Sequence, residues 1–471
     1  MTQPTAATQD RWGDRLPRRL GFWSAVAVLV GSTIGSGIFR TPAGVASNVP
    51  DVPVFLLAWV LGAVVALCGA LTYAELAAAF PRTGGLYVFL REAFGPLAGF
   101  LFGWGELVII RPGAYGAISI TSSAYAIRVL HSLGLTALDP ASPVITVGSV
   151  TIAAEQALAA GLIVVVAAVN WFGIHRGAIL QNLSTALKVL ALATLVGLGF
   201  LLGGSHGVPG MLSQHAPVAL SPFLVAMVAI LWAYDGWADL AFVSGEVRDP
   251  QRNLPRAIIL GTAGVVVLYL GAIFVYLHLI PMSQMGGAQL VAADAAQILL
   301  GPAGVVFVGA AVAVSTFGTL NGSMMTAPRI FFALGEDGLF PRWIARVSEK
   351  NGAPTGAILL AAFLGAAFVL VRTFAALADQ FVIGIWPFYA MGVAAVFVLR
   401  SRRPDLERPY RTWGYPVVPA LFLLGSVFLL GNYLVSQPRA FALDVGLILL
   451  GIPAYYLWLW IKRRFLTALP A

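Results

Sequence analysis

Two short stretches rich in glycine and polar residues interrupt long apolar segments of the chain. They are residues 31–37 (GSTIGSG) and residues 232–237 (WAYDGW). Glycine lowers helix propensity and exposes backbone, and unpaired backbone groups persist within a lipid bilayer only where they line a cavity enclosed by protein. Both stretches are therefore predicted to be breaks in helices that border a binding cavity.

The first break is suited to bind a carboxylate. A half-helix that starts within residues 33–37 presents free N–H groups and the positive end of its dipole. Glycine lets a ligand approach the bare backbone, and the Ser36 hydroxyl can add a donor. The alternative is a helix-packing face, since Gly31 and Gly35 have small-xxx-small spacing. The candidate binding residues are Thr33, Ile34, Gly35, Ser36 and Gly37.

The second break is suited to bind an ammonium group. The half-helix before it ends near Tyr234 and exposes unpaired carbonyls at the negative end of its dipole. Asp235 could contact a basic ligand side chain, but we favour a cap on the following half-helix, next to Gly236. The carbonyls assigned to the ammonium are those of Trp232, Ala233 and Asp235, with Thr33 and Ile34.

Three charged residues lie inside apolar segments and need partners there. Lys188 is about ten residues inside its segment, too deep for its ammonium to reach an interface easily. Glu106 and Arg111 are interpreted as structural residues, each with its charge neutralised within the bundle. Next to them, Ile109 and Ile110 are candidates for the apolar wall of the pocket.

The composition of the chain indicates that these residues lie within a membrane. The chain has 471 residues, of which 59% are hydrophobic and only 10% charged, which indicates a polytopic membrane protein. The net charge of +8 is scattered between apolar runs, so no nucleic-acid partner is expected. Cys68, the only cysteine, allows no internal disulfide.

The apolar segments predict an all-α integral membrane protein with twelve transmembrane helices. Lys and Arg crowd into alternate loops, so both termini are expected to be cytoplasmic. The breaks fall in segments one and six, and an offset of five reverses direction, which favours two inverted five-helix repeats. The segments are approximately 20–46, 54–80, 94–130, 151–173, 178–203, 219–245, 256–281, 301–335, 355–373, 376–399, 414–436 and 443–462. The predicted units are a tail at 1–19, repeats at 20–203 and 204–399, and two added helices with a tail at 400–471.

With these breaks in place, the chain resembles the amino acid-polyamine-organocation superfamily, and within it the L-type amino-acid transporter group. The matching stretches are residues 31–39 (GSTIGSGIF), 106–112 (ELVIIRP), 231–258 (LWAYDGWADLAFVSGEVRDPQRNLPRAI), and 321–332 (NGSMMTAPRIFF) with 403–410 (RPDLERPY). The resemblance implies a LeuT-like fold and transport of free amino acids by alternating access. It also implies that Trp232 is an aromatic gate over the substrate. The alternative is that Trp232 is an ordinary tryptophan that packs in the bilayer or the core. Lys188 resembles the lysine that replaces sodium in sodium-independent relatives. This resemblance implies that its partners are carbonyls of the first break and the hydroxyls of Ser315 or Thr316.

These observations predict a sodium-independent permease or exchanger of L-amino acids in the inner (plasma) membrane, without a cofactor or bound metal. A proton-coupled symporter is the first alternative, and a channel or a membrane sensor of amino acids is harder to exclude. An enzyme is not expected, because the five histidines are dispersed. The loop at 131–150 lacks the cysteine that links animal L-type transporters to a glycoprotein, so no disulfide-linked subunit is expected.

Overall fold

The computed structural model describes residues 16–466 except 148, 149, 206, 209, 210, 214 and 289, and this part is almost entirely helical. Most of the predicted N-terminal tail and residues 467–471 lie outside the described residues. The elements of the first half are α1 (Phe22–Thr33), α2 (Gly37–Asn48), α3 (Val52–Ala79), α4 (Leu86–Phe94), α5 (Pro96–Gly105), the π-helical turn η2 (Glu106–Ile110), α6 (Arg111–Ser132), β1 (Pro143–Val147), β2 (Val150–Ala153), α7 (Ala154–Trp171) and α8 (Ile174–Leu202).

The second half is also helical. Two 3-10 turns precede it, η3 (Gly203–Ser205) and η4 (Met211–Ser213), and the described part of the chain ends in the π-helical turn η7 (Lys462–Leu466). The elements between them are α9 (Leu220–Tyr234), α10 (Asp239–Phe242), η5 (Ser244–Glu246), α11 (Pro250–Leu279), α12 (Met282–Met285), α13 (Val291–Leu300), α14 (Pro302–Thr326), α15 (Pro328–Glu336), η6 (Arg342–Ala345), α16 (Thr355–Val369), α17 (Phe374–Arg402), α18 (Val417–Ser436), α19 (Pro438–Leu449) and α20 (Gly451–Ile461).

Ten helical stretches of the described chain are long and apolar enough to cross a membrane. Several of them join two elements across a bend, as Phe22–Asn48 and Pro302–Glu336 do. Two further predicted segments fall on the shorter apolar helices Leu220–Tyr234 and Thr355–Val369. The chain is therefore a multi-pass membrane protein.

Both predicted helix breaks are present. Helix α1 ends at Thr33 and α2 begins at Gly37, whereas α9 ends at Tyr234 and α10 begins only at Asp239. The backbone turns to extended angles at Asp235 (ψ 153°) and to φ 119° at Gly236. Only glycine adopts a φ of 119° at low cost, so the second break requires the glycine at position 236.

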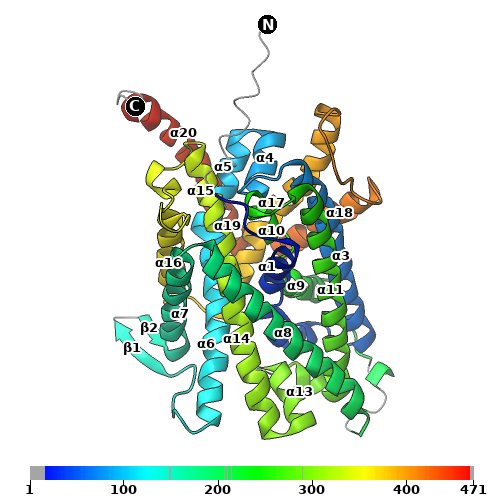
Figure 1. Ribbon diagram of the computed structural model, residues 1–471. Coiled ribbons are helices and arrows are strands. Elements are labelled where there is room, and N and C mark those ends of the chain that lie inside the picture. The colour runs from blue at the N-terminus through cyan, green and yellow to red at the C-terminus, as the bar shows by residue number, and fades with distance from the viewer. Residues whose placement is uncertain are drawn as a thin grey trace.

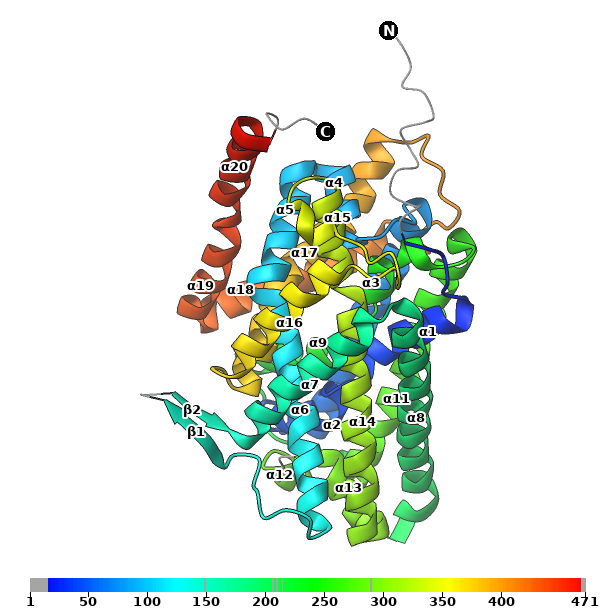
Figure 2. The ribbon, with the colours of Figure 1, turned by 60° about the vertical axis from the view of Figure 1, so that its left-hand side comes forward.

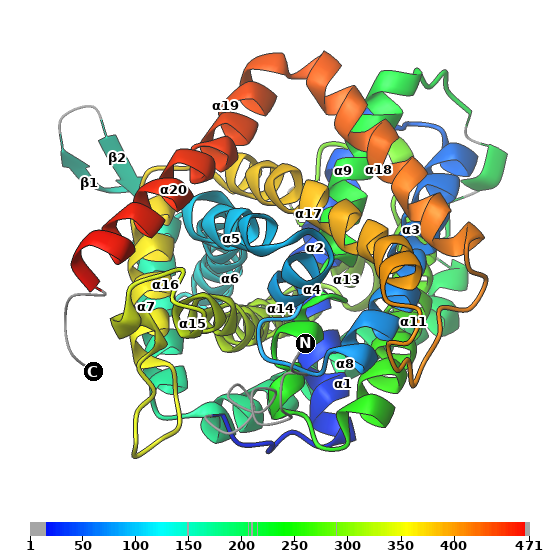
Figure 3. The same cartoon turned by 90° about the horizontal axis from the view of Figure 1, so that it is seen from above.

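The broken helices lie inside the bundle. Helix α1 packs against α8, α11 and α14, and α2 packs against α9. Helix α6 packs against α14, α16 and α17 on another side of the same interior. The view along the bundle shows α18, α19 and α20 on its outside (Figure 3).

The two ends of the bundle differ. Helices α4, α5, α15 and α20 gather at one end, here called the α4/α20 end (Figure 1). The hairpin of β1 and β2, antiparallel with Val147 opposite Val150, projects near the opposite end together with α12 and α13 (Figure 2). That second end is called the hairpin end.

Candidate functional site

The two helix breaks touch each other. A Cβ atom on Gly236 would lie 2.7 Å from the Thr33 backbone nitrogen, closer than real side chains approach. Gly236 therefore lets the second break come against the first, in addition to supplying its positive φ. The free ends of α1, α2, α9 and α10 are thereby brought to one place.

A small cavity of about 30 Å³ lies between the breaks. The space left free between the breaks is therefore small in this conformation. Its lining residues come from α1, α2, α6, α9, α10, α14 and α17. They are Ser32, Thr33, Gly35, Ser36, Gly37, Arg111, Ala114, Ile118, Trp232, Asp235, Gly236, Asp239, Thr319, Ser323 and Phe381.

Most predicted residues of the first break line this cavity, but Ile34 does not. Its carbonyl accepts hydrogen bonds from Lys188 Nζ (2.8 Å), Thr319 Oγ1 (2.9 Å) and Ser315 Oγ (3.1 Å). The Thr33 carbonyl accepts one from the Tyr269 hydroxyl at 2.8 Å. In this conformation the lone pairs of the Ile34 carbonyl already face these donors, and its contact with a ligand stays a prediction.

Three further predicted positions serve packing in this structure. A Cβ atom on Gly37 would lie 2.4 Å from Ala233 Cα, so these two residues hold α2 against α9. Ala233 itself does not line the cavity. Ile110 is fully buried, packs toward Gly384 of α17, and also lies away from the cavity. The apolar wall is instead formed by Ala114, Ile118 and Phe381.

The carboxylate of Asp235 accepts a hydrogen bond from the Tyr389 hydroxyl at 2.8 Å. Helix α10 starts after Ala238, where no side chain caps its N-terminus. The favoured interpretation of Asp235 as a helix cap is thus replaced by a tyrosine contact at the cavity wall.

Lys188 joins three elements around the first break. Its Nζ donates to the carbonyls of Gly31 and Ile34 and to Thr319 Oγ1, each at 2.8 Å, and the residue is 1% exposed. These bonds connect α8 with α1 and α14. Thr316, expected as a partner, donates instead to Val312 of its own helix at 2.8 Å. Sequence reasoning missed Thr319, which lies one helical turn further along and accepts from Lys188 in place of Thr316.

A second buried network closes the other side of the cavity. Arg111 donates from Nε to Glu106 at 2.6 Å, from Nη2 to Asp239 at 3.2 Å and from Nη1 to Ser323 at 3.1 Å. The π-helical turn Glu106–Ile110 directly precedes Arg111. The charges of Glu106 and Arg111 are thus neutralised within the bundle, partly by pairing with each other. Asp239 was not foreseen, although its spacing of four residues from Asp235 could have indicated it.

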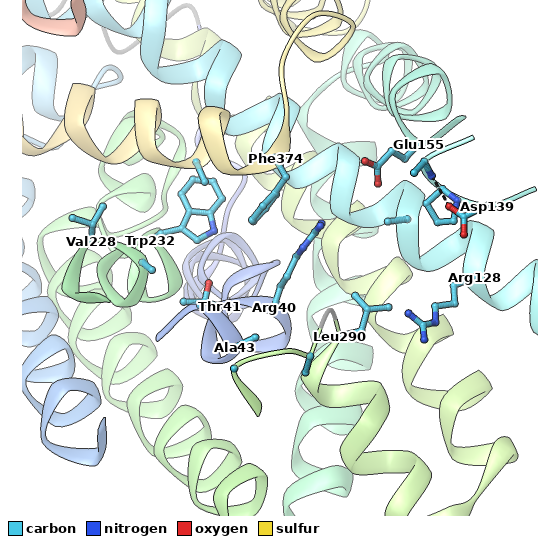
Figure 4. Close-up of a pocket in the computed structure, with 18 of the residues that line it drawn as sticks. Arg40, Thr41, Ala43, Arg128, Asp139, Glu155, Val228, Trp232, Leu290 and Phe374 are labelled. Atoms are coloured by element: carbon cyan, nitrogen blue, oxygen red, sulfur yellow. Dashed lines mark hydrogen bonds between the residues drawn. The ribbon is translucent and has the colours of Figure 1, made fainter. Parts of the chain in front are cut away.

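A much larger cavity of about 930 Å³ opens toward the hairpin end and is called the vestibule. It is lined by parts of α2, α6, α9 and α17 and by the loop before the hairpin (Figure 4). Trp232 lines both the vestibule and the small cavity, and its Nε1 donates to Ser36 Oγ at 3.3 Å. Its ring packs edge-on against Phe381, with centroids 5.1 Å apart. Trp232 therefore separates the two cavities.

The path toward the α4/α20 end is sealed by buried polar contacts. The Leu20 N–H donates to the Glu246 carbonyl at 2.9 Å, and the Arg248 N–H donates to the Leu20 carbonyl at 2.8 Å. The Glu246 carboxylate pairs with Arg329 Nε at 2.8 Å, with both side chains at most 1% exposed. The cavity at the breaks thus faces the vestibule and is closed on the other side.

Comparison with known proteins supplies the relatives of this chain. A protein-family model described as "Amino acid permease" matches residues 20–458. The chain is 30% identical to the mouse (Mus musculus) b(0,+)-type amino acid transporter 1 over 95% of this chain and 89% of that protein. It is 30% identical to the serine/threonine exchanger SteT of Bacillus subtilis (strain 168), over 94% and 97%. It is 31% identical to the mouse large neutral amino acids transporter small subunit 2, over 98% and 85%.

These matches span nearly the whole chain and cover both helix breaks. They agree with the expectation that the protein is not an enzyme. The chain therefore belongs to the amino acid permease family of the amino acid-polyamine-organocation superfamily.

Proposed function

We propose that this chain is a sodium-independent secondary transporter that exchanges L-amino acids across the membrane by alternating access. The observation that carries the proposal is the meeting of two broken helices at a cavity that faces a vestibule on one side and is sealed on the other. A carrier needs a site that can be exposed to either side in turn. The relatives named as amino acid transporters and as an exchanger support the same class.

The proposed substrate orientation follows from the helix ends. The N-terminus of α2, with Ser36 at its start, would bind the α-carboxylate. The C-terminus of α9, near Asp235, would bind the α-ammonium, and Asp235 itself lines this side of the cavity. The side chain would lie toward Ile118 and Phe381.

We further propose twelve membrane crossings, arranged as two inverted five-helix repeats followed by two additional helices. The paired breaks in α1/α2 and α9/α10 support this arrangement, since such breaks recur at matching positions of inverted repeats. The two shorter apolar helices, Leu220–Tyr234 and Thr355–Val369, complete the count of twelve. The proposed boundaries are 20–203, 204–399 and 400–471.

Sodium independence is proposed from Lys188. Its ammonium already supplies a positive charge to the carbonyls of Gly31 and Ile34. Such carbonyl oxygens are ligands that a sodium ion would otherwise use. A bound sodium ion is then not needed to hold the first break.

The orientation is proposed from the charges of the loops. Arg82, Arg91, Arg400 and Arg403 lie in or beside loops at the α4/α20 end, which would therefore be cytoplasmic. The vestibule then opens to the outside, and the membrane is the inner (plasma) membrane. Although one relative is named a small subunit, we propose that this chain acts without a disulfide-linked partner, because its only cysteine, Cys68, is 5% exposed within α3.

A competition panel tests the proposal. Purified protein in liposomes would take up radiolabelled L-leucine and L-serine, with each unlabelled amino acid as competitor, in sodium-free buffer, with and without a pH gradient. Ala114→Leu should abolish saturable uptake, because Ala114 lines the small cavity. The matched control Ala229→Leu places the same side chain in the larger vestibule and should transport. Uptake that rises with an inward proton gradient would support proton symport instead of exchange.

A further inference from the structure

The vestibule holds an arginine whose charge is not neutralised by an ion pair. Arg40 belongs to α2 and is half-buried, and its Nη1 atom is buried without a hydrogen-bond partner. Its guanidinium lies over the ring of Phe374, 4.4 Å from the centroid. Burying a cationic donor without an acceptor costs free energy, so an acceptor is missing from this position.

A carboxylate of opposite charge lines the same cavity. Glu155, at the start of α7, is half-buried and acts electrostatically on Arg40. Among the ion pairs of the described residues, none joins Glu155 or Arg40 to any partner. Figure 4 shows Arg40 beside Phe374, with Glu155 farther along the vestibule and Trp232 on the other side. The two opposite charges thus line the same cavity without forming an ion pair with each other.

The remaining charged groups of the vestibule are placed differently. Asp139 is exposed, and its carboxylate already accepts a hydrogen bond from the Ala141 N–H at 2.9 Å. Arg128 is exposed on the final turns of α6. Arg40 and Glu155 are therefore the half-buried pair of opposite charges within this cavity.

We propose that Arg40 and Glu155 form an outer docking site for a zwitterionic amino acid, with the α-carboxylate on Arg40 and the α-ammonium on Glu155. This inference rests on the proposed transport function and adds a second binding site on the vestibule side of Trp232. Arg40 follows Gly37 by three residues in α2, so the docked molecule lies one helical turn from the cavity at the breaks. Capture here raises the local concentration of substrate at the gate.

Uptake into intact cells tests the site, because only the outer face then meets the label. The probes are radiolabelled L-leucine and L-serine, two zwitterions with different side chains. Arg40→Gln and Glu155→Gln should each raise KM about tenfold for both probes, as expected for a charge-assisted hydrogen bond, while kcat changes little. Arg40→Lys should keep much of the wild-type KM. The matched control Arg128→Gln, which removes an exposed charge, should change KM far less.

A binding measurement separates this site from the one at the breaks. Purified Ala114→Leu protein, in which the small cavity is filled, should retain weak saturable binding of L-leucine, and adding Arg40→Gln should remove it. If Arg40→Gln does not reach the membrane, Glu155→Gln carries the test.

The possible failures are distinct. If the wild type takes up neither probe nor any other amino acid, the proposed transport function fails. If the wild type transports but both neutral variants keep its KM, the outer site is wrong. It is also wrong if Arg40→Lys and Arg40→Gln are equally impaired while Glu155→Gln is normal, since Arg40 would then serve packing against Phe374.

Discussion

Replacing Lys188 by methionine should slow exchange strongly while the protein remains folded. Methionine nearly keeps the length of the side chain but removes the ammonium and its three hydrogen bonds of 2.8 Å. Those bonds tie the first break to α8 and α14 in the conformation seen here. Because alternating access requires α1 to move relative to its neighbours, their loss acts on the conformational equilibrium.

The size of the effect follows from the donors that remain. Thr319 Oγ1 lies 3.0 Å from the Gly31 carbonyl, and Ser315 Oγ lies 3.1 Å from the Ile34 carbonyl. Each hydroxyl has one proton, so each carbonyl can keep one donor and neither is stranded. The net loss is then that of hydrogen bonds to a charged donor, about 1.5 to 3 kcal/mol, which shifts a two-state equilibrium roughly ten- to 150-fold.

The assay is exchange of labelled L-leucine or L-serine in liposomes, in sodium-free buffer, with thermal unfolding of the purified protein as the control for folding. Thr319→Val should slow exchange as well, because it removes a hydroxyl bonded to Lys188. Thr316→Val is the matched control and should exchange normally, since its hydroxyl bonds only within α14. A folded Lys188→Met protein that exchanges at the wild-type rate, or a wild type that requires sodium, would refute the reasoning.

Three further variants test other parts of the site. Trp232→Ala should reduce the transport rate more than equilibrium binding, because Trp232 separates the two cavities; equal losses would place the indole in the binding site itself. Glu246→Gln should lower the free energy of unfolding by roughly 3 to 5 kcal/mol, because it leaves the guanidinium of Arg329 buried without its anion. An unchanged melting curve would contradict this prediction. Gly236→Ala should lower the free energy of unfolding by roughly 1 to 3 kcal/mol, because alanine is strained at this positive φ, and the new Cβ atom would also clash with Thr33. A variant of normal stability and activity would show that the two breaks need not touch.

The sequence was sufficient to predict the helical membrane architecture and both helix breaks. Glycine and polar residues in the middle of apolar runs have few structural explanations in a bilayer, so residues 31–37 and 232–237 identified the breaks directly. The buried position of Lys188 also followed from its depth in an apolar segment, whereas its contact with the first break was implied by the family resemblance.

Contacts that depend on side-chain direction could not be predicted in this way. Thr316 and Thr319 lie on the same helix, and only the rotation of α14 decides which hydroxyl reaches Lys188. Likewise, Ile110 is adjacent to Arg111, but it points toward α17 and away from the cavity. Asp235 contacts Tyr389, which is 154 residues away in the chain, so local capping rules could not reveal it.

Counterflow exchange tests the central claim most directly. Liposomes that contain the purified protein would be loaded with unlabelled L-leucine, L-serine or buffer, and uptake of the labelled amino acid would be followed without sodium. The account predicts saturable uptake that is accelerated by amino acid trapped inside, and loss of this acceleration in Ala114→Leu. Binding without any saturable uptake, or flux that neither saturates nor responds to trapped amino acid, would contradict a carrier and indicate a sensor or a channel.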